Sequence, residues 1–215
     1  MTVVVLNGSP NPKGTVAKLL KQVISGLDNQ VKFDWVDVYA LNMTSCIGCM
    51  KCRAEGKCAL PADDAHVIGK KIRNAEGIVI GTPTHWGNMS APLKILLDRN
   101  VPVFIGEKAD GMPEPRQKGK PAVIVSACTT PWPFNFIARE SRGAVNSVKH
   151  VLHYGGYKIL GTVVKPGMKK DREISAAIYK QAEKLGSKLS RALAKYIVGR
   201  RVDYKNTKIE SYNWE

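Results

Sequence analysis

The sequence predicts an α/β protein, a three-layer sandwich built around a five-stranded, doubly wound parallel sheet. Two observations lead to this fold class. Short apolar runs alternate with amphipathic segments of helical period along the chain. Most of the apolar runs are continuous and rich in β-branched residues, which is typical of strands that are buried on both faces.

The predicted elements follow from these two patterns in order. Apolar runs predict strands at 3–7, 32–38, 77–81, 122–127 and 158–164. Apolar residues at a helical spacing predict helices at 15–27, 66–75, 92–98, 136–152 and 174–196. In the first helix the spacing is carried by Val16, Leu19, Leu20, Val23, Ile24 and Leu27. The segment 99–120, which contains three prolines and three glycines, is predicted to be a long surface connection.

Length and composition indicate a single soluble domain. The 215 residues suit one core, and we expect a domain at 1–199 and a polar tail at 200–215. The chain begins with a short apolar strand instead of a signal peptide, and no apolar run approaches membrane-spanning length. Four of the five cysteines are crowded between Cys46 and Cys58, which fits a redox or metal site in a reducing compartment. We therefore expect a cytoplasmic protein with no membrane partner.

The net charge of +15 raises the question of an anionic partner. The positive excess leans toward the C-terminal end, where it is spread over the amphipathic helix and the tail instead of forming one basic run. This distribution favours a solvated face over a nucleic-acid surface.

Three loops at the predicted carboxyl edge of the sheet carry unusual residues, and ligands of open parallel sheets bind at that edge. The first loop, residues 7–15, runs from a buried strand into a helix start and contains Gly8, Ser9, Lys13 and Thr15. Unpaired N–H groups at a helix N-terminus, flexible glycines and hydroxyl donors form a phosphate cradle. Lys13 precedes Gly14, so the order of a Walker A loop is not met. A second interpretation is a tight turn with Thr15 as the helix cap.

The second loop, residues 81–94, offers groups that suit a flat polar heterocycle. A proline turn presents His85 and Trp86, and Gly87 and Asn88 follow with backbone groups able to meet a polar rim. Ser90 also fits the role of a helix N-cap. In the third loop, residues 126–132, small and hydroxyl residues would let the backbone approach the same ligand, and Cys128 is expected to be a buried apolar side chain.

The cysteine loop, residues 46–58, spaces Cys46, Cys49, Cys52 and Cys58 by two, two and five residues. Closely spaced thiolates around a glycine suit the four-cysteine ligation of a [4Fe–4S] cluster. Structural zinc, which usually takes two separated pairs of ligands, and four unliganded thiols are the alternatives. Asp63 and Asp64, just after the loop, fit a helix cap better than a pair of catalytic acids.

Together these loops resemble the flavodoxin-like superfamily and, within it, the NADPH-dependent FMN reductase family and its iron-sulfur flavoprotein relatives, over at least residues 1–165. The resemblance implies FMN as cofactor and, for the cysteine spacing, a [4Fe–4S] cluster. It implies the following flavin contacts, with the phosphate residues first and the ring residues after them: Ser9, Asn11, Lys13, Thr15 and Val16; Pro83, Thr84, His85, Trp86, Gly87 and Asn88; and Ser126 and Thr129 closing over the ring. His85 departs from the family, in which this position is usually tyrosine, and it brings an ionisable imidazole near the ring.

The expected function is that of an FMN-dependent oxidoreductase that takes electrons from NAD(P)H or reduced ferredoxin and passes them to a quinone, a flavin or another small acceptor. The resemblance also implies a homodimer or homotetramer with the flavin near an interface. The alternative is a non-catalytic electron carrier, or a flavin-dependent regulator that binds nucleic acid or a protein through its basic C-terminal region.

Overall fold

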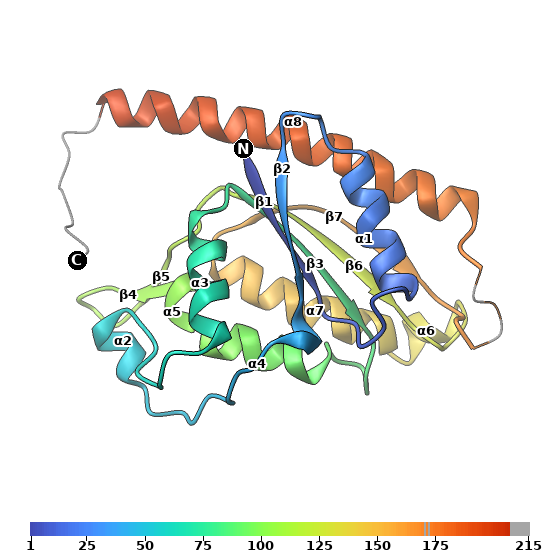
Figure 1. Cartoon of the computed structure of the whole chain (residues 1–215), viewed down its shortest axis with the longest axis horizontal. Helices are drawn as coiled ribbons and strands as arrows, with labels where there is room; N and C mark the ends of the chain where they lie inside the picture. Colours follow the sequence, from blue (N-terminus) through green and yellow to red (C-terminus); the bar gives the residue numbers. More distant parts are fainter. Residues whose placement is uncertain (170, 172, 207–215) are drawn as a thin grey trace.

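The computed structural model describes residues 1–169, 171 and 173–206 of the chain (Figure 1). Its centre is a five-stranded parallel sheet in the order β2-β1-β3-β6-β7. The strands are β1 (Thr2–Asn7), β2 (Lys32–Asp37), β3 (Gly77–Pro83), β6 (Pro121–Ala127) and β7 (Lys158–Lys165). The predicted fold class and strand number are confirmed, and the order is that of flavodoxin-like sheets.

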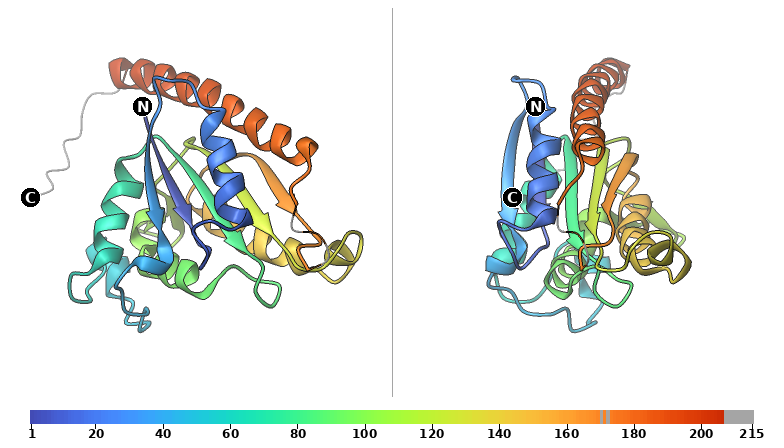
Figure 2. Two further views of the ribbon diagram at one scale, coloured as in Figure 1. Left: turned by 45° about the vertical axis from the view of Figure 1, so that its right-hand side comes forward. Right: turned by 90° about the vertical axis from the view of Figure 1, so that its right-hand side faces the viewer.

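Helices cover both faces of the sheet, which gives the three predicted layers (Figure 2). One face is packed by α1 (Thr15–Ser25) and α8 (Ala176–Asn206), and the other by α3 (Asp64–Asn74), α4 (Ala91–Arg99) and α7 (Glu140–Tyr154). The sheet therefore has a separate apolar core on each side. Within the described residues, no helix combines the length and the apolar character needed to cross a membrane.

The C-terminal helix α8 is held closely against α1 and the open edge of the sheet. A Cβ atom at Gly186 would collide with the carbonyl of Val23, so this glycine permits the close helix crossing. Along the edge strand, Gln181 donates a hydrogen bond to the carbonyl of Thr162 (3.3 Å) and Lys188 donates one to that of Leu160 (2.7 Å). Of the polar tail predicted at 200–215, residues 200–206 belong to α8, and residues 207–215 lie outside the described residues.

The prediction that segment 99–120 is a surface connection was wrong. It contains α5 (Val101–Phe104) and a two-stranded hairpin of β4 (Ile105–Glu107) and β5 (Pro113–Pro115). Phe104 is 1% exposed in the core. The Gln117 amide donates to the carbonyl of Val103 (2.6 Å), which ties the far end of the segment to α5.

Two further boundaries differ from the predicted ones. The predicted helix at 136–152 is interrupted, because α6 (Phe134–Ile137) and α7 are separated at Arg139, whose φ is 57°. The end of the predicted strand at 32–38 is a short 3-10 helix, η1 (Val38–Ala40). Neither break is marked by glycine or proline at the break itself, and tertiary packing overrides the local pattern.

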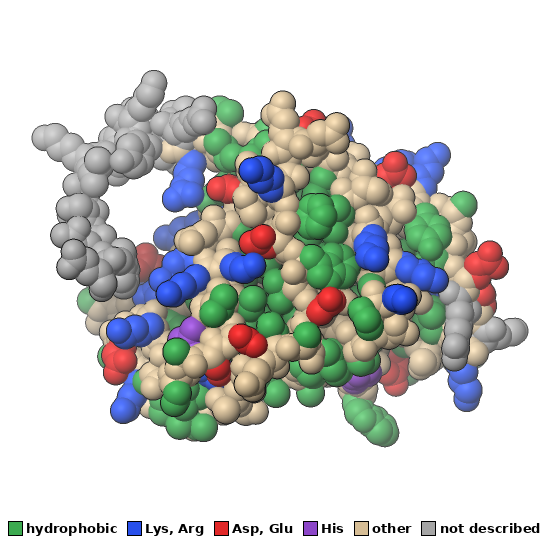
Figure 3. Space-filling model, viewed as in Figure 1, with side chains coloured by type: hydrophobic (Ala, Val, Ile, Leu, Met, Phe, Trp, Pro, Cys, Tyr) green, Lys and Arg blue, Asp and Glu red, His purple; other side chains and the backbone are tan. Residues whose placement is uncertain are grey.

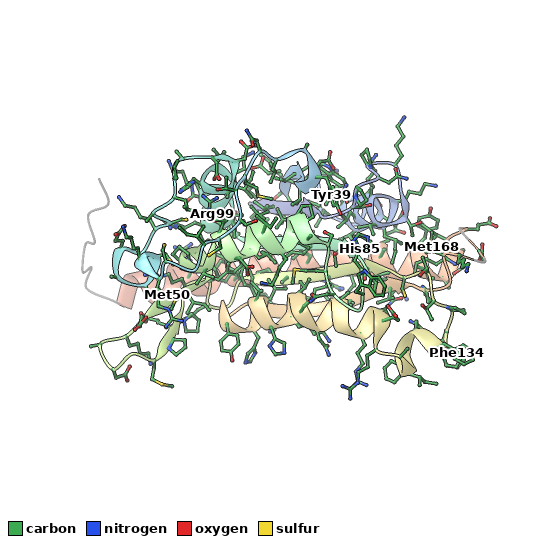
Figure 4. The ribbon with its side chains drawn as sticks, turned by 90° about the horizontal axis from the view of Figure 1, so that it is seen from below. Tyr39, Met50, His85, Arg99, Phe134 and Met168 are labelled. Atoms are coloured by element: carbon green, nitrogen blue, oxygen red, sulfur yellow. The ribbon has the colours of Figure 1, made fainter. Side chains whose placement is uncertain are left out.

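The strand register brings the ends of β1, β3 and β6 to one edge. Asn7 pairs with Gly81, and Gly81 pairs with Val125, so the first, second and third loops leave the sheet close together. Figure 4 looks onto this carboxyl edge, with His85 near its middle. The fold thus gathers the three loops that were singled out in the sequence.

Candidate functional site

The first loop is a compact turn held by its own side chains. The amide of Gly8 donates to the carbonyl of Gly81 (2.8 Å), which fixes the loop to β3. The Ser9 hydroxyl accepts from the amide of Asn11 (3.2 Å), and the Asn11 side-chain oxygen accepts from the amide of Lys13 (3.0 Å). These bonds shape the loop around the N-terminus of α1, where a phosphate would sit.

The first turn of α1 has no side-chain cap among the described residues. Gly14 is the N-cap residue. Thr15 is the first helical residue, so the alternative in which Thr15 caps α1 is wrong. The Val16 side chain is buried in the core, which leaves its backbone N–H as the group able to reach a phosphate. Asn11 and Lys13, just before this helix start, are exposed.

The second loop is a tight hairpin. The amide of His85 donates to the carbonyl of Asn88 (2.9 Å), and the amide of Asn88 donates back over the same distance. The two residues between them, Trp86 and Gly87, have φ angles of 51° and 67°. This is the geometry of a two-residue turn with both φ angles positive, and it presents the Trp86 side chain fully to solvent.

Ser90 joins the first and second loops. Its hydroxyl donates to the carbonyl of Gly8 (2.7 Å), and its amide donates to the hydroxyl of Thr82 (3.0 Å). It is the N-cap residue of α4, with Pro92 in the first turn, as predicted, but among the described residues its side chain makes no cap hydrogen bond. The serine instead locks the two loops to each other.

Two hydroxyl groups at this edge are buried without a partner among the described residues. They are Oγ1 of Thr84, in the second loop, and Oγ of Ser126, at the end of β6. A buried hydroxyl without a hydrogen bond is unfavourable, so such groups mark a place where a polar ligand fits. Thr129, in the third loop, is exposed, and Cys128 is buried as predicted. The phosphate and the polar ring of FMN fit this set of groups.

Exposed apolar side chains surround the same end of the molecule. Trp132 is 74% exposed, and Phe134, Phe136 and Ile137 on α6 are exposed at 62%, 57% and 70%. Figure 4 shows Phe134 at one end of this edge, and Figure 3, seen from the side away from α6, shows other hydrophobic side chains along the lower edge. Such a patch marks an interaction surface. The interpretation of 136–152 as one amphipathic helix concealed it, because that interpretation placed Phe136 on a packed face.

The cysteine loop lies at the other end of the carboxyl edge. In Figure 4, Met50 and Arg99 lie toward one end, while Met168 and Phe134 lie at the other. The loop contains α2 (Lys51–Glu55), which packs on α5 and on the β4–β5 hairpin. Arg116 donates to the carbonyls of Pro102 (2.7 Å) and Gly56 (3.4 Å), so the segment 99–120 acts as a platform for the loop.

The four thiols of this loop lie within electrostatic reach of one another. Burial raises the pKa of the Cys52 thiol, and the neighbouring Cys58, Cys46 and Cys49 raise it further. All four are free, and Cys46 and Cys49 are exposed. In the described residues no group of three or more such side chains is close enough to hold a single metal ion. A cuboidal cluster keeps its ligand sulfurs further apart than one ion does, and the four-thiol donor set fits it.

Arg99 connects the last cysteine to the body of the protein. Its Nε–H donates to Sγ of Cys58 (3.2 Å), and its NH1 group donates to Oδ2 of Asp63 (2.6 Å). Asp63 is also the N-cap of α3, as predicted for this position, in a capping box with His66. Burial raises the pKa of Asp63, but the hydrogen bonds from Arg99 and the contact with the His66 side chain outweigh this effect and leave the pKa below its usual value. Arg99 could not be singled out from the sequence, since a single arginine at a helix end is usually exposed.

Comparison with known proteins identifies relatives over nearly the whole chain. Residues 1–164 match the NADPH-dependent FMN reductase family. An iron-sulfur flavoprotein of Methanocaldococcus jannaschii is 31% identical over 198 residues, which cover 88% of this chain and 96% of that protein. An iron-sulfur flavoprotein of Clostridioides difficile is 27% identical over 201 residues, 92% of this chain and 78% of that protein.

Solved structures support the same fold. The NAD(P)H:quinone oxidoreductase from Methanothermobacter marburgensis superposes with a TM-score of 0.66 at 17% identity, over 88% of this chain and 96% of that one. An FMN-dependent NADH-azoreductase from Bacillus anthracis, in complex with FMN, has a TM-score of 0.66 at 13% identity, over 88% and 98% of the two chains. Because the family match covers most of the sequence and includes all three loops of the carboxyl edge, the chain belongs to the NADPH-dependent FMN reductase family and is an oxidoreductase.

Proposed function

We propose that this FMN-dependent oxidoreductase passes reducing equivalents from NAD(P)H or reduced ferredoxin to a quinone, a free flavin or another small acceptor. The observation that carries the proposal is that, within the described structure, the buried hydroxyls of Thr84 and Ser126 have no hydrogen-bond partner and no side chain caps the start of α1. A ligand with one anionic end and one polar ring would satisfy both features.

In this proposal the phosphate of FMN lies in the first loop. Hydroxyl, amide, amine and backbone N–H groups would hold the phosphate at the positive end of the α1 dipole. These groups belong to the side chains of Ser9, Thr15, Asn11 and Lys13 and to the backbone of Val16. The present hydrogen bonds of Ser9 and Asn11 within the loop keep these groups in place before the ligand arrives. This preorganisation lowers the entropic cost of binding.

The ring lies between the second and third loops. Its polar rim would meet Thr84, Ser126 and backbone groups of the second loop, from Pro83 to Asn88, while Thr129 borders it from the third loop. Bound FMN supplies the hydride and single-electron chemistry. The protein orients the flavin ring and leaves space beside it for the second substrate. The exposed His85 and Trp86 stand at the rim, where an acceptor or a nicotinamide ring can stack.

A second redox site is proposed at the cysteine loop, in which Cys46, Cys49, Cys52 and Cys58 hold a [4Fe–4S] cluster. The names of the relatives from M. jannaschii and C. difficile support this assignment. Four free thiols also suit the reducing cytoplasm, which is the proposed location.

We also propose a homodimer or homotetramer. Support comes from the exposed Phe134, Phe136 and Ile137 on α6 and from Trp132. Burying these side chains against a second copy would remove a large apolar patch from water, next to the proposed flavin site.

The proposed function is tested on protein purified without oxygen, by absorbance together with flavin, iron and sulfide assays. We expect one FMN and one four-iron cluster for each chain, and turnover of NAD(P)H with a quinone at a rate well above that of free FMN. A protein that contains neither flavin nor iron would contradict both cofactor assignments. Flavin with a rate equal to that of free FMN would favour the non-catalytic carrier.

The cysteine assignment has a matched control within the same chain. Cys49→Ser is expected to lose the iron and to retain the flavin, because the two sites lie apart on the carboxyl edge. Cys128→Ala changes the one cysteine outside the loop, which is buried at the end of β6, and it is expected to retain the iron. Equal iron contents in the two variants would rule out ligation by the loop.

A further inference from the structure

Arg99 is an unusual residue because its charged side chain is completely buried. It is the last residue of α4, and its side chain has an exposed fraction of 0%. Arginine is almost never fully buried unless its donors are all matched. The partners of the guanidinium therefore define its role.

The guanidinium is fixed in one orientation by its planar fork. NH1 and NH2 form a bidentate pair with the carboxylate of Asp63 (2.6 and 3.1 Å). NH1 also donates to the carbonyl and the hydroxyl of Thr44 (2.8 and 2.9 Å). A bidentate pair fixes the plane of the guanidinium as well as its position. The remaining Nε–H is directed at Sγ of Cys58, 3.2 Å away.

These contacts join the two ends of the cysteine loop. Thr44 lies two residues before Cys46, and Cys58 is the last of the four cysteines. The pair with Asp63 would stabilise the fold with any cation of suitable reach. A donor to sulfur is a separate feature, since neither the helix cap nor the ion pair requires it. Hydrogen bonds to ligand sulfurs and nearby positive charge stabilise the more negative, reduced state of an iron–sulfur cluster.

We propose that Arg99 is a positioning residue for the cysteine site, which fixes the sulfur of Cys58 and, through its Nε–H, raises the reduction potential of the cluster. The inference rests on the proposed [4Fe–4S] cluster. It assigns a function to a residue on α4, far from the cysteines in sequence. A device of this kind would set the direction in which electrons pass between the cluster and its partners.

The test measures the midpoint potential of the cluster by EPR-monitored redox titration of the full-length, iron-loaded protein. Arg99→Lys keeps the positive charge and can still pair with Asp63, but it lacks the fork that holds a donor on the sulfur. We expect the ratio of reduced to oxidised cluster at a fixed potential to fall about tenfold, which equals a shift of about 59 mV to lower potential for a one-electron couple.

Arg53→Lys is the matched control. Arg53 lies on α2 next to Cys52, is exposed and pairs weakly with Glu107 (3.8 Å). No hydrogen bond joins it to a cysteine sulfur in the described structure. We expect the midpoint potential of the cluster in Arg53→Lys to equal that in the wild type. An unchanged potential in Arg99→Lys, or equal shifts in the two variants, would overturn the inference.

A measurement on the wild-type protein covers the case in which Arg99→Lys fails to fold, as judged by circular dichroism and thermal melting. Arginine labelled with ¹⁵N only at Nε is incorporated, and pulsed EPR of the reduced cluster looks for a ¹⁵N coupling. The coupling is expected, and its absence would refute the inference even with the cluster intact. A wild-type protein that binds no iron would instead refute the proposed cluster itself, and the inference with it.

Discussion

A Cβ atom on Gly143 would collide with the carbonyl oxygen of Gly87, so the first turns of α7 rest directly on the backbone of the second loop. Helix α7 thus supports the turn that carries His85 and Trp86. Glycine inside a helix costs about 1 kcal/mol relative to alanine, but at this position only glycine leaves room for the Gly87 carbonyl.

We expect Gly143→Ala to weaken FMN binding about tenfold and to lower the free energy of unfolding by about 1–3 kcal/mol, because the added methyl group displaces the loop. Gly199→Ala, in the exposed part of α8 with no described atom within 4 Å of its Cβ position, is expected to leave FMN affinity unchanged. Fluorescence titration and urea unfolding measure the two quantities. Equal FMN affinities in the two variants would contradict the supporting role of Gly143.

Ser126→Ala tests the unpartnered hydroxyl at the end of β6. Without FMN the variant should be as stable as the wild type or more stable, since it removes a buried hydroxyl that has no hydrogen-bond partner among the described residues. With FMN it should bind about tenfold more weakly, because a bond worth about 1.4 kcal/mol is lost. The control Ser147→Ala removes a hydroxyl that donates to the carbonyl of Ala144 within α7, and it should not change FMN affinity. Weaker stability with unchanged affinity would show that Ser126 has no part in binding.

The apolar patch on α6 predicts the route of self-association. Phe134→Asp with Ile137→Asp places two charges where exposed apolar side chains stand, and it should shift the protein toward monomer in sedimentation velocity. The fold should survive, because neither side chain is buried in the core. Val198→Asp on α8, 62% exposed, is the control and should leave the assembly unchanged. A monomeric wild type would contradict the proposed oligomer directly.

Lys120 gives a prediction about pH. Its side chain is buried and its Nζ donates to the carbonyl of Arg73 at the end of α3 (2.7 Å). Burial, with a smaller effect from Arg200, lowers the pKa of Lys120 from 10.5 to about 8. Between these two values the unfolded chain holds a proton that the folded protein has released, so stability rises with pH.

We therefore expect the wild type to gain about 2–3 kcal/mol over Lys120→Met as the pH rises from 7 to 10.5. The measurement is urea unfolding at a series of pH values. Lys118→Met changes a side chain that is 67% exposed and provides the control. Parallel pH curves for the wild type and Lys120→Met would show that the buried amine does not titrate in this range.

The sheet and the three carboxyl-edge loops could be predicted from the sequence because their signals are local. Buried parallel strands are continuous apolar runs, and the first loop combines glycines with a helix start. The segment 99–120 could not be predicted, since its proline-rich sequence resembles a loop and its structure depends on Phe104 packing in a distant core. Arg99 was missed for a related reason. Its partners Thr44, Cys58 and Asp63 come together only after the chain has folded.

The side chains of Gln181 and Lys188 occupy carbonyl groups on the outer edge of β7. A strand at the border of a sheet otherwise offers a row of free acceptors to any extended chain that approaches it. Because these carbonyl groups already accept hydrogen bonds, one of them from a lysine, β7 is a poor template for strand addition by another molecule. The C-terminal helix therefore protects this edge of the sheet from pairing with a strand of another molecule.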